Sequence, residues 1–333
     1  MFRNNSSFVV SPGSLILHDP LHYALYLAVT VFVCSLGTIL SFLLLTAMIK
    51  ERKLFHGSRL LIISQILTEL QEFFIHLPLT LTGTLIAEIE ARTVFHQLTF
   101  CQYALFFNLT VLCASIWGLC ILAVNRFMAI TFTKPMLYKR FSSWKAQLLQ
   151  LLFVYMLTIG LHVTYLFPGL EASVAIDPVK ICGTMRLGSL YTVETVVGKI
   201  LPICLTIVVY LVLFVAIIRK KQRRQVRVGD NVNKTSNNVL RKRMAMAKLL
   251  GATAIVHGVT YLVYPVYAWM VPVPERNAML TLWLRLSFHA GQLSTTIFFL
   301  AMSSDCRRAV RRLFRCNRVT ERSNVNTLST PQA

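Results

Sequence analysis

The stretch CQYALFFNLTVLCASIWGLCILAVNRF, residues 101–127, decides the fold of this chain. Its residues 102–124 form an uncharged and largely apolar run that is long enough to cross about 30 Å of hydrocarbon as a helix. The run ends at Asn125 and Arg126, and a second apolar stretch follows at once. Because a guanidinium is costly inside a membrane unless it lies at an edge or has a partner, we expect Arg126 at the end of a transmembrane helix.

Six more apolar runs of this kind occur along the chain. The 333 residues are 55% hydrophobic, and a soluble chain of this length would contain a larger proportion of polar residues to cover its surface. The runs do not alternate polar and apolar residues as the strands of a membrane barrel do. The sequence therefore predicts an all-α membrane protein, a seven-transmembrane helix bundle. The seven runs are Pro20–Ile49, Leu60–Ile86, Gln102–Val124, Ala146–Leu166, Ile200–Ile218, Leu249–Val271 and Leu286–Met302. Since the last run is short, we expect its helix to begin near Met279.

The basic residues between the runs indicate how the bundle is oriented. If the N-terminus is extracellular, the four inner segments hold 4, 5, 11 and 7 Lys and Arg, which is 27 of the 34 in the chain. This asymmetry predicts an extracellular N-terminus and a cytoplasmic C-terminus in the plasma membrane. The net charge of +21 is then an orientation signal. We expect anionic inner-leaflet lipid as a partner, and no nucleic acid.

The ends of the chain differ from the bundle in composition. We predict an extracellular tail at 1–22, the bundle at 23–302, an amphipathic membrane-surface helix at 303–316 and a disordered cytoplasmic tail at 317–333. The N-terminal tail contains NNSS, which offers N-glycosylation sequons at Asn4 and Asn5. The segment CRRAVRRLFRC, residues 306–316, places an apolar stripe among arginines, as interfacial helices do. Its Cys316 is a candidate for S-palmitoylation, with an unmodified thiol as the alternative.

Two of the eight cysteines fall in the predicted extracellular part. Cys101 lies at the outer end of the third run, and Cys182 lies in the loop between the fourth and fifth runs. A disulfide between them would tie that loop across the bundle. The alternative is a pair of free thiols.

Several motifs resemble the rhodopsin-like G-protein-coupled receptors. Cys101 precedes Asn125-Arg126-Phe127 by 24 residues, and this family carries a disulfide cysteine and an Asp-Arg-Tyr triplet at that separation. Further matches are Glu69 nine residues before Pro78, Pro202 eight residues before Tyr210, and Pro265 in the sixth run. The resemblance implies helix kinks at Pro78, Pro202 and Pro265.

The sequence also departs from this family. The sixth run reads TYLVYP and lacks the usual Trp two residues before its proline. The seventh run reads STTIFF where the family has Asn-Pro-x-x-Tyr, so that Thr295, Thr296 and Phe299 occupy those places. Together with the Asn-Arg-Phe triplet, these departures resemble the divergent serpentine chemosensory receptors of nematodes.

The resemblance implies that Asn125, Arg126, Phe127 and Tyr210 couple the receptor to a heterotrimeric G protein, with arrestin as a further partner. Asn125 can offer Arg126 only a neutral hydrogen bond, which is weaker than a charge-assisted one. No Asp or Glu occurs between Asp230 and Glu275, so an acid is also missing at the inner end of the sixth run. We therefore expect signalling without ligand. The alternative is that Tyr210 and backbone carbonyls hold Arg126.

In this family the ligand, a small molecule or a peptide, binds in the outer part of the bundle. The corresponding residues here are Asn108, Glu194, Tyr267, Arg285 and His289. Arg285 would favour an anionic ligand, unless Glu194 or Glu171 neutralises it. For each of these residues the alternative is packing. The seventh run has no lysine, so we expect no retinal Schiff base.

One face of the second run carries Gln65, Glu69, Glu72 and His76. Glu69 resembles the sodium-binding acid of the family. A hydrogen-bond network that includes Thr295 is the alternative to a Na⁺ site, and Glu72 and His76, four residues apart, could pair with each other. We expect no other cofactor and no metal site.

Catalytic motifs are missing from the sequence. It contains no HExxH, no P-loop and no GxSxG, so we predict a receptor and no enzyme. A transporter or a ligand-gated channel subunit is the alternative function. Internal repeats or paired broken helices would favour that alternative, and neither stands out.

Overall fold

The structure is a computed structural model. It describes residues 19–51, 58–89, 98–131, 135–167, 174–176, 182–184, 192–225, 251–267, 270–271, 277–302 and 306–314. The predicted glycosylation sites Asn4 and Asn5 and the predicted lipidation site Cys316 lie outside these residues. So do the tail 317–333 and nearly all of the tail 1–22.

In the described part of the chain, seven helical spans make up the predicted bundle. They are α2 (Pro20–Lys50), α3 (Arg59–Gln71) continued by η1 (Glu72–His76) and α4 (Leu77–Ile89), α5 (Leu98–Thr131), α7 (Trp144–His162) continued by η3 (Val163–Leu166), η4 (Glu194–Ile200) continued by α9 (Leu201–Gln225), the helix of residues 251–267, and α11 (Ala278–Met302). The last of these begins one residue before the predicted start. Five of the described spans are also long and apolar enough to cross a membrane by length and composition alone.

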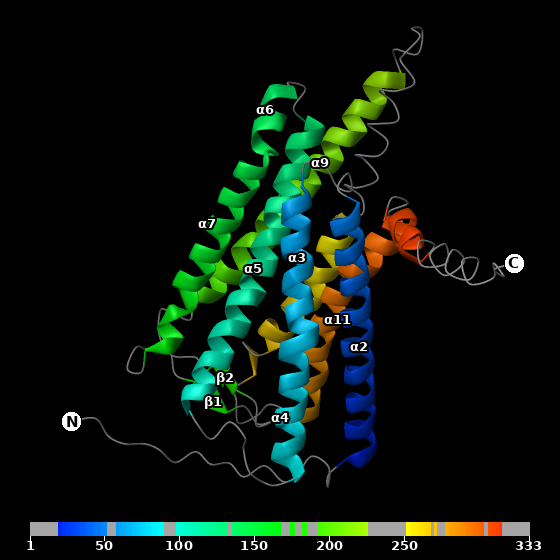
Figure 1. Cartoon of the computed structure of the whole chain (residues 1–333). Helices are drawn as coiled ribbons and strands as arrows, with labels where there is room; N and C mark the ends of the chain where they lie inside the picture. Colours follow the sequence, from blue (N-terminus) through cyan, green and yellow to red (C-terminus); the bar gives the residue numbers. More distant parts are fainter. Residues whose placement is uncertain are drawn as a thin grey trace, which may run out of the picture.

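Smaller elements distinguish the two ends of the bundle (Figure 1). The strands β1 (Val174–Ile176) and β2 (Cys182–Thr184) form an antiparallel hairpin at one end, which we call the hairpin end. The short helix α6 (Pro135–Phe141) lies at the opposite end, which we call the α6 end. The helix of residues 306–314 also lies toward the α6 end.

Side-chain caps begin several of the spans, and α2 and α7 are two examples. The Asp19 carboxylate accepts the His22 backbone N–H at 3.2 Å, and Pro20 fills the first helical position of α2. The His22 ring also bonds this carboxylate, and these hydrogen bonds lower the pKa of Asp19 below its usual value. At α7 the Ser143 hydroxyl accepts the Ala146 N–H at 3.3 Å. Both helices therefore begin where a polar side chain satisfies an N–H that has no partner within the helix.

Two of the predicted kink prolines follow π-helical segments. Pro78 comes just after η1, and Pro202 comes just after η4. Proline removes an N–H and crowds the carbonyl four residues earlier, and a wider π-helical turn is one way to accommodate that loss. In η1 the Phe73 carbonyl instead accepts the Cys34 thiol, at 2.8 Å. Pro265 lies within helical residues, two positions before the described helix 251–267 ends.

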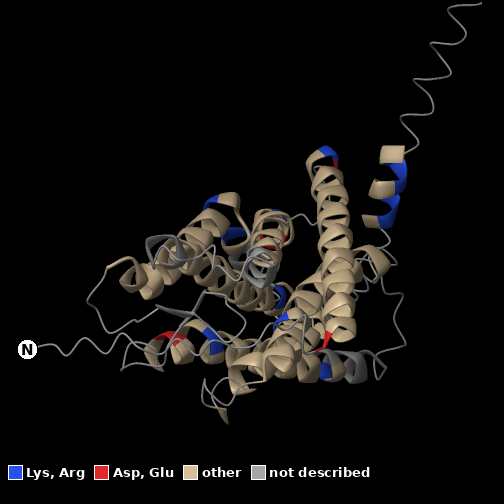
Figure 2. Cartoon of the chain, turned by 90° about the horizontal axis from the view of Figure 1, so that it is seen from below, with Lys and Arg blue, Asp and Glu red and all other residues tan. Residues whose placement is uncertain are grey.

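Apolar side chains cover the outside of the bundle. Phe42, Leu149 and Phe214 are more than half exposed, although each is large and hydrophobic. Figure 2 shows long uncharged stretches of helix, with basic bands on the short helix of residues 306–314. Such a surface is stable where lipid replaces water.

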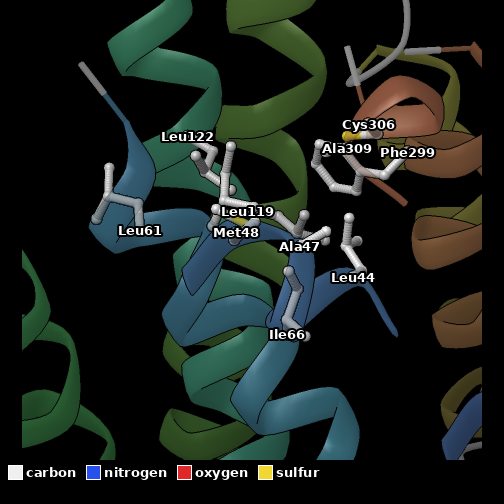
Figure 3. Close-up of a cluster of buried hydrophobic side chains, with 11 residues drawn as sticks. Leu44, Ala47, Met48, Leu61, Ile66, Leu119, Leu122, Phe299, Cys306 and Ala309 are labelled. Carbon is white, nitrogen blue, oxygen red and sulfur yellow. The ribbon is translucent and has the colours of Figure 1, made fainter. Parts of the chain in front are cut away.

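The core lies around α5, of whose membrane span 67% is buried, against 22% of the span in η4 and α9. Near the α6 end, side chains from α2, α3, α5, α11 and the helix 306–314 meet in one hydrophobic cluster (Figure 3). Leu44, Met48, Leu122 and Cys306 in this cluster have no exposed surface. The helix 306–314 is thereby attached to the bundle by its apolar side.

The helix α11 packs closely against the helix 251–267 at Gly291, and a substitution there tests this contact. A methyl group added at Gly291 would lie 1.9 Å from Thr260 Oγ1 and 2.9 Å from its Cβ. We expect Gly291→Ala to lower the melting temperature of the purified protein in detergent, because overpacking costs about 1–3 kcal/mol. Gly160→Ala is the control, since nothing lies within 4 Å of its added Cβ. Equal melting temperatures for the two variants and the wild type would contradict the close packing of the two helices at Gly291.

Candidate functional site

A buried acid–base cluster lies between α5, α7 and η4. Lys199 Nζ is 2.8 Å from Glu194 Oε1, and the Tyr165 hydroxyl donates to Glu194 Oε2. Glu194 is only 2% exposed. Lys199 lies five residues after Glu194, a spacing that does not bring side chains together on an α-helix. The i→i+5 repeat of the π-helical η4 brings them together.

His162 extends this acid–base cluster into α7. Its Nδ1 donates to the Thr158 carbonyl at 2.7 Å. Its Nε2 lies 3.7 Å from Glu194 Oε1 and 3.6 Å from Cys113 Sγ. The Glu194 carboxylate, which the sequence placed in the ligand site, is therefore already engaged by Lys199, Tyr165 and His162.

A second polar network crosses the middle of the bundle. Gln65 Nε2 donates to Ser115 Oγ at 2.7 Å and to Glu69 Oε1 at 3.4 Å. The Thr296 hydroxyl donates to Glu69 Oε2 at 2.7 Å, and Ser41 Oγ lies 3.5 Å from Thr296 Oγ1. Glu69 has no exposed surface. This network joins α2, α3, α5 and α11.

These contacts favour the hydrogen-bond network over a sodium site at Glu69. Both carboxylate oxygens already accept a hydrogen bond, one from the Gln65 amide and one from Thr296. An amide N–H cannot ligate a cation. The sequence named Thr295 as a partner of Glu69; Thr295 interacts with this carboxylate, and its neighbour Thr296 makes the 2.7 Å hydrogen bond.

Glu72 and His289 face each other between η1 and α11. His289 Nδ1 lies 3.3 Å from Glu72 Oε1, and the two side chains are 12% and 2% exposed. The sequence suggested that Glu72 could pair with His76. Within the structure His76 Nε2 lies 3.4 Å from Thr80 Oγ1 instead.

The other predicted ligand residues occupy different parts of the bundle. Arg285 Nη2 donates to Tyr264 Oη at 3.0 Å, and its guanidinium lies over the Tyr264 ring, 5.2 Å from the centroid. Tyr267 Oη accepts the Asn277 N–H at 3.1 Å. Asn108 is half-buried on α5. Arg285 and His289 thus share α11, whereas Glu194 belongs to the acid–base cluster.

The predicted disulfide concerns side chains that the structure does not describe. Cys101 lies in α5 and Cys182 begins β2, but their side chains are outside the described part of the chain. The strand β2 contacts α5. The Cys101–Cys182 bond stays a prediction.

Near the α6 end, Arg126 lies inside the bundle. Its Nη2 donates to Ser58 Oγ. Arg126 is 7% exposed, Asn125 is 1% exposed and Ser58 has no exposed surface. Phe127 and Tyr210 pack in one hydrophobic cluster beside it. The structure therefore brings together the four residues that the sequence assigned to G-protein coupling.

The sequence analysis did not identify three residues that make contacts inside the bundle. Ser58, just before the second run, carries a helix-start signal, and Lys199 is five residues from Glu194, a spacing that is significant only in a π-helix. The third residue is Tyr261. Counting back from its proline places Val263 where the family has Trp, but Val263 is 41% exposed and Tyr261 is 2% exposed. Tyr261 stacks on His257, one helical turn earlier.

The Glu194–Lys199 pair can be tested by charge removal. Lys199→Met leaves a buried carboxylate without its closest cation, and breaking a buried pair costs about 3–5 kcal/mol. We expect this variant to melt well below the wild type, and the neutral double variant Glu194→Gln/Lys199→Met to recover most of the loss. The melting temperature of the purified protein measures both changes in stability. The control is Arg312→Ala, which removes an exposed pair with Glu51 (2.6 Å) and costs at most about 1 kcal/mol. A double variant no more stable than Lys199→Met contradicts the pairing.

Comparisons with known proteins agree with this arrangement. The crystal structure of squid rhodopsin matches with a TM-score of 0.74 at 14% identity, over 89% of this chain and 86% of the squid chain. At that identity the likeness shows the fold. No curated protein sequence matches. A family model described as 7 transmembrane receptor (rhodopsin family) matches residues 40–307. The chain belongs to the rhodopsin family of seven-transmembrane receptors.

Proposed function

We propose that this receptor binds an extracellular ligand from its hairpin end and activates a heterotrimeric G protein at its α6 end. The observation that carries the proposal is Arg126, a permanent cation held inside the bundle near the α6 end of α5. The excess of Lys and Arg in the segments at that end supports a cytoplasmic α6 end and an extracellular N-terminus. The location is the plasma membrane.

The proposed mechanism is a shift between two arrangements of the helix 251–267. In the arrangement described here Gly251 packs on Tyr210, and a Cβ at Gly251 would lie 3.4 Å from the Tyr210 ring. Outward movement of this helix opens the bundle beside Phe127 and Arg126. The exposed guanidinium then binds the G protein, and the ligand acts by favouring that arrangement.

The ligand proposed for the hairpin end carries an anionic group that pairs with Arg285. Lys199 holds Glu194 at 2.8 Å, and Arg285 donates to the Tyr264 hydroxyl at 3.0 Å. A guanidinium suits planar carboxylates. His289, one helical turn further along α11, would contact the remainder of the ligand, with Asn108 and Tyr267 as further candidates.

We propose anionic lipid and arrestin as further partners at the α6 end. The exposed Arg307, Arg308, Arg311 and Arg312 of the helix 306–314 would face anionic inner-leaflet lipid. Arrestin and a chemosensory role belong to the same proposal, because the departures from the common motifs resemble nematode chemosensory receptors. Membership of the rhodopsin family speaks against the transporter and channel alternatives.

A reporter cell with a promiscuous G protein tests the proposal. Small carboxylates and small amines are applied, and we expect responses to carboxylates. Arg126→Ala should abolish the response at normal surface expression, because the G protein loses its contact. Arg285→Gln should raise the half-maximal concentration about tenfold and keep the maximum, because one charge-assisted bond to the ligand is lost. A response that survives Arg126→Ala contradicts the coupling site.

Asn125→Asp tests the resting state. A carboxylate beside Arg126 strengthens its hold in the buried position by a charge-assisted bond, so we expect ligand-independent output to fall about fivefold. Second-messenger accumulation without ligand measures this, normalised to receptor at the surface. Asn277→Asp is the control, because it makes the same change at the cap of α11, where either side chain accepts the Leu280 N–H. Equal output from Asn125→Asp and wild type would count against a weakly restrained Arg126.

A further inference from the structure

Ser58 and Arg126 make a contact that the known motifs of the sequence do not contain. Ser58 immediately precedes α3, and its hydroxyl accepts a hydrogen bond from Arg126 Nη2 on α5. Ser58 has no exposed surface. The buried and neutral Ser58 hydroxyl thus helps to hold the Arg126 guanidinium, which binds the G protein in the proposed function.

Ser58 occupies the cap position of α3, yet its side chain does not cap that helix. A serine at this position ordinarily accepts an N–H from the first turn. Here the Leu60 N–H donates to Gln147 Oε1 of α7 at 3.1 Å. The Gln147 Nε2 donates to the Ser142 carbonyl at 2.7 Å, which fixes the orientation of the amide.

Gln147 is therefore a cap supplied from another helix, and it has a consequence for Ser58. Gln147 is 4% exposed, so water does not replace it at the start of α3. Because Gln147 satisfies the Leu60 N–H, the Ser58 hydroxyl is available to Arg126. Without Gln147, the unsatisfied N–H of the first turn and the guanidinium would compete for the same hydroxyl.

We propose that Ser58 and Gln147 are positioning residues that together restrain Arg126 in the resting receptor and set its signalling without ligand. This inference rests on the proposed function, since it assumes that Arg126 binds the G protein. The restraint that Ser58 supplies differs from an ionic one because the serine hydroxyl is neutral. The inference also predicts that Gln147, which does not contact Arg126, acts through Ser58.

The test measures ligand-independent nucleotide exchange on purified heterotrimeric G proteins, per folded receptor in nanodiscs. Loss of one hydrogen bond to a charged group shifts a two-state equilibrium about tenfold, so Ser58→Ala should raise the exchange rate by up to that factor. Gln147→Ala should raise it severalfold. In the Ser58→Ala background, Gln147→Ala should add nothing, because its effect passes through the missing hydroxyl.

Ser143→Ala is the matched control. The Ser143 hydroxyl caps α7 through the Ala146 N–H, so its loss removes a cap of the same kind without touching Arg126. It should lower the melting temperature and leave the exchange rate unchanged. A merely structural role for Ser58 or Gln147 would give that same pattern and would overturn the inference.

The remaining outcomes separate the inference from the proposed function. Suppose that Arg126→Ala abolishes nucleotide exchange, whereas Ser58→Ala leaves it at the wild-type rate. That result would overturn the proposed restraint by Ser58, and the proposed G-protein contact of Arg126 would stand. Additive effects of Ser58→Ala and Gln147→Ala overturn the link between the two residues. If no G protein responds to the wild type or to any variant, the proposed function and the inference both fail.

Discussion

Hydrocarbon offers no hydrogen bonds, and the rest of this structure depends on that constraint. A polar side chain that the bundle buries must find its partner on another helix or on its own backbone. The helix α5 supplies such a partner at three depths, through Cys113, Ser115 and Arg126. The span α5, two thirds of which is buried, therefore also connects the polar layers to one another.

The three layers meet the constraint with different chemistry. Toward the hairpin end, the charges of Glu194 and Lys199 compensate each other. In the middle, Glu69 accepts hydrogen bonds from the neutral donors Gln65 and Thr296. Near the α6 end, a cation donates to the neutral Ser58. Charge compensates charge in the first of these contacts, whereas a charged group meets neutral partners in the other two, and neutral hydrogen bonds are weaker than charge-assisted pairs.

The spans could be predicted from the sequence because burial in lipid demands long apolar runs. The start of α11 was predicted to within one residue, and the prolines of the second and fifth runs marked the places where α-helix gives way. The residue at which each π-helical segment begins, however, cannot be predicted from hydropathy. A π-helical turn adds a residue, and it rotates the residues on its two sides relative to each other.

Partner choice was the part that could not be predicted. Spacing on a regular helix suggested that Glu72 and His76 are neighbours, but both lie in η1, where the α-helical repeat does not hold. The same geometry in η4 makes neighbours of Glu194 and Lys199. Spacing also cannot say which faces of two helices meet. Hence Arg285 lies against Tyr264, and Glu194, one of the two acids that the sequence offered as its neutraliser, lies against Lys199.

The departures from the common receptor motifs have one physical character. Asn125 stands where the family has an acid, Thr296 stands where it has a proline, and Ser58 holds the arginine. Each contact made at these places is neutral on at least one side. A ligand can shift an equilibrium only by the difference in its free energy of binding to the two arrangements. In the proposed function, a neutral contact such as that of Ser58 with Arg126 adds less to that difference than an ionic one would, so a ligand that forms few contacts at the hairpin end could open the α6 end.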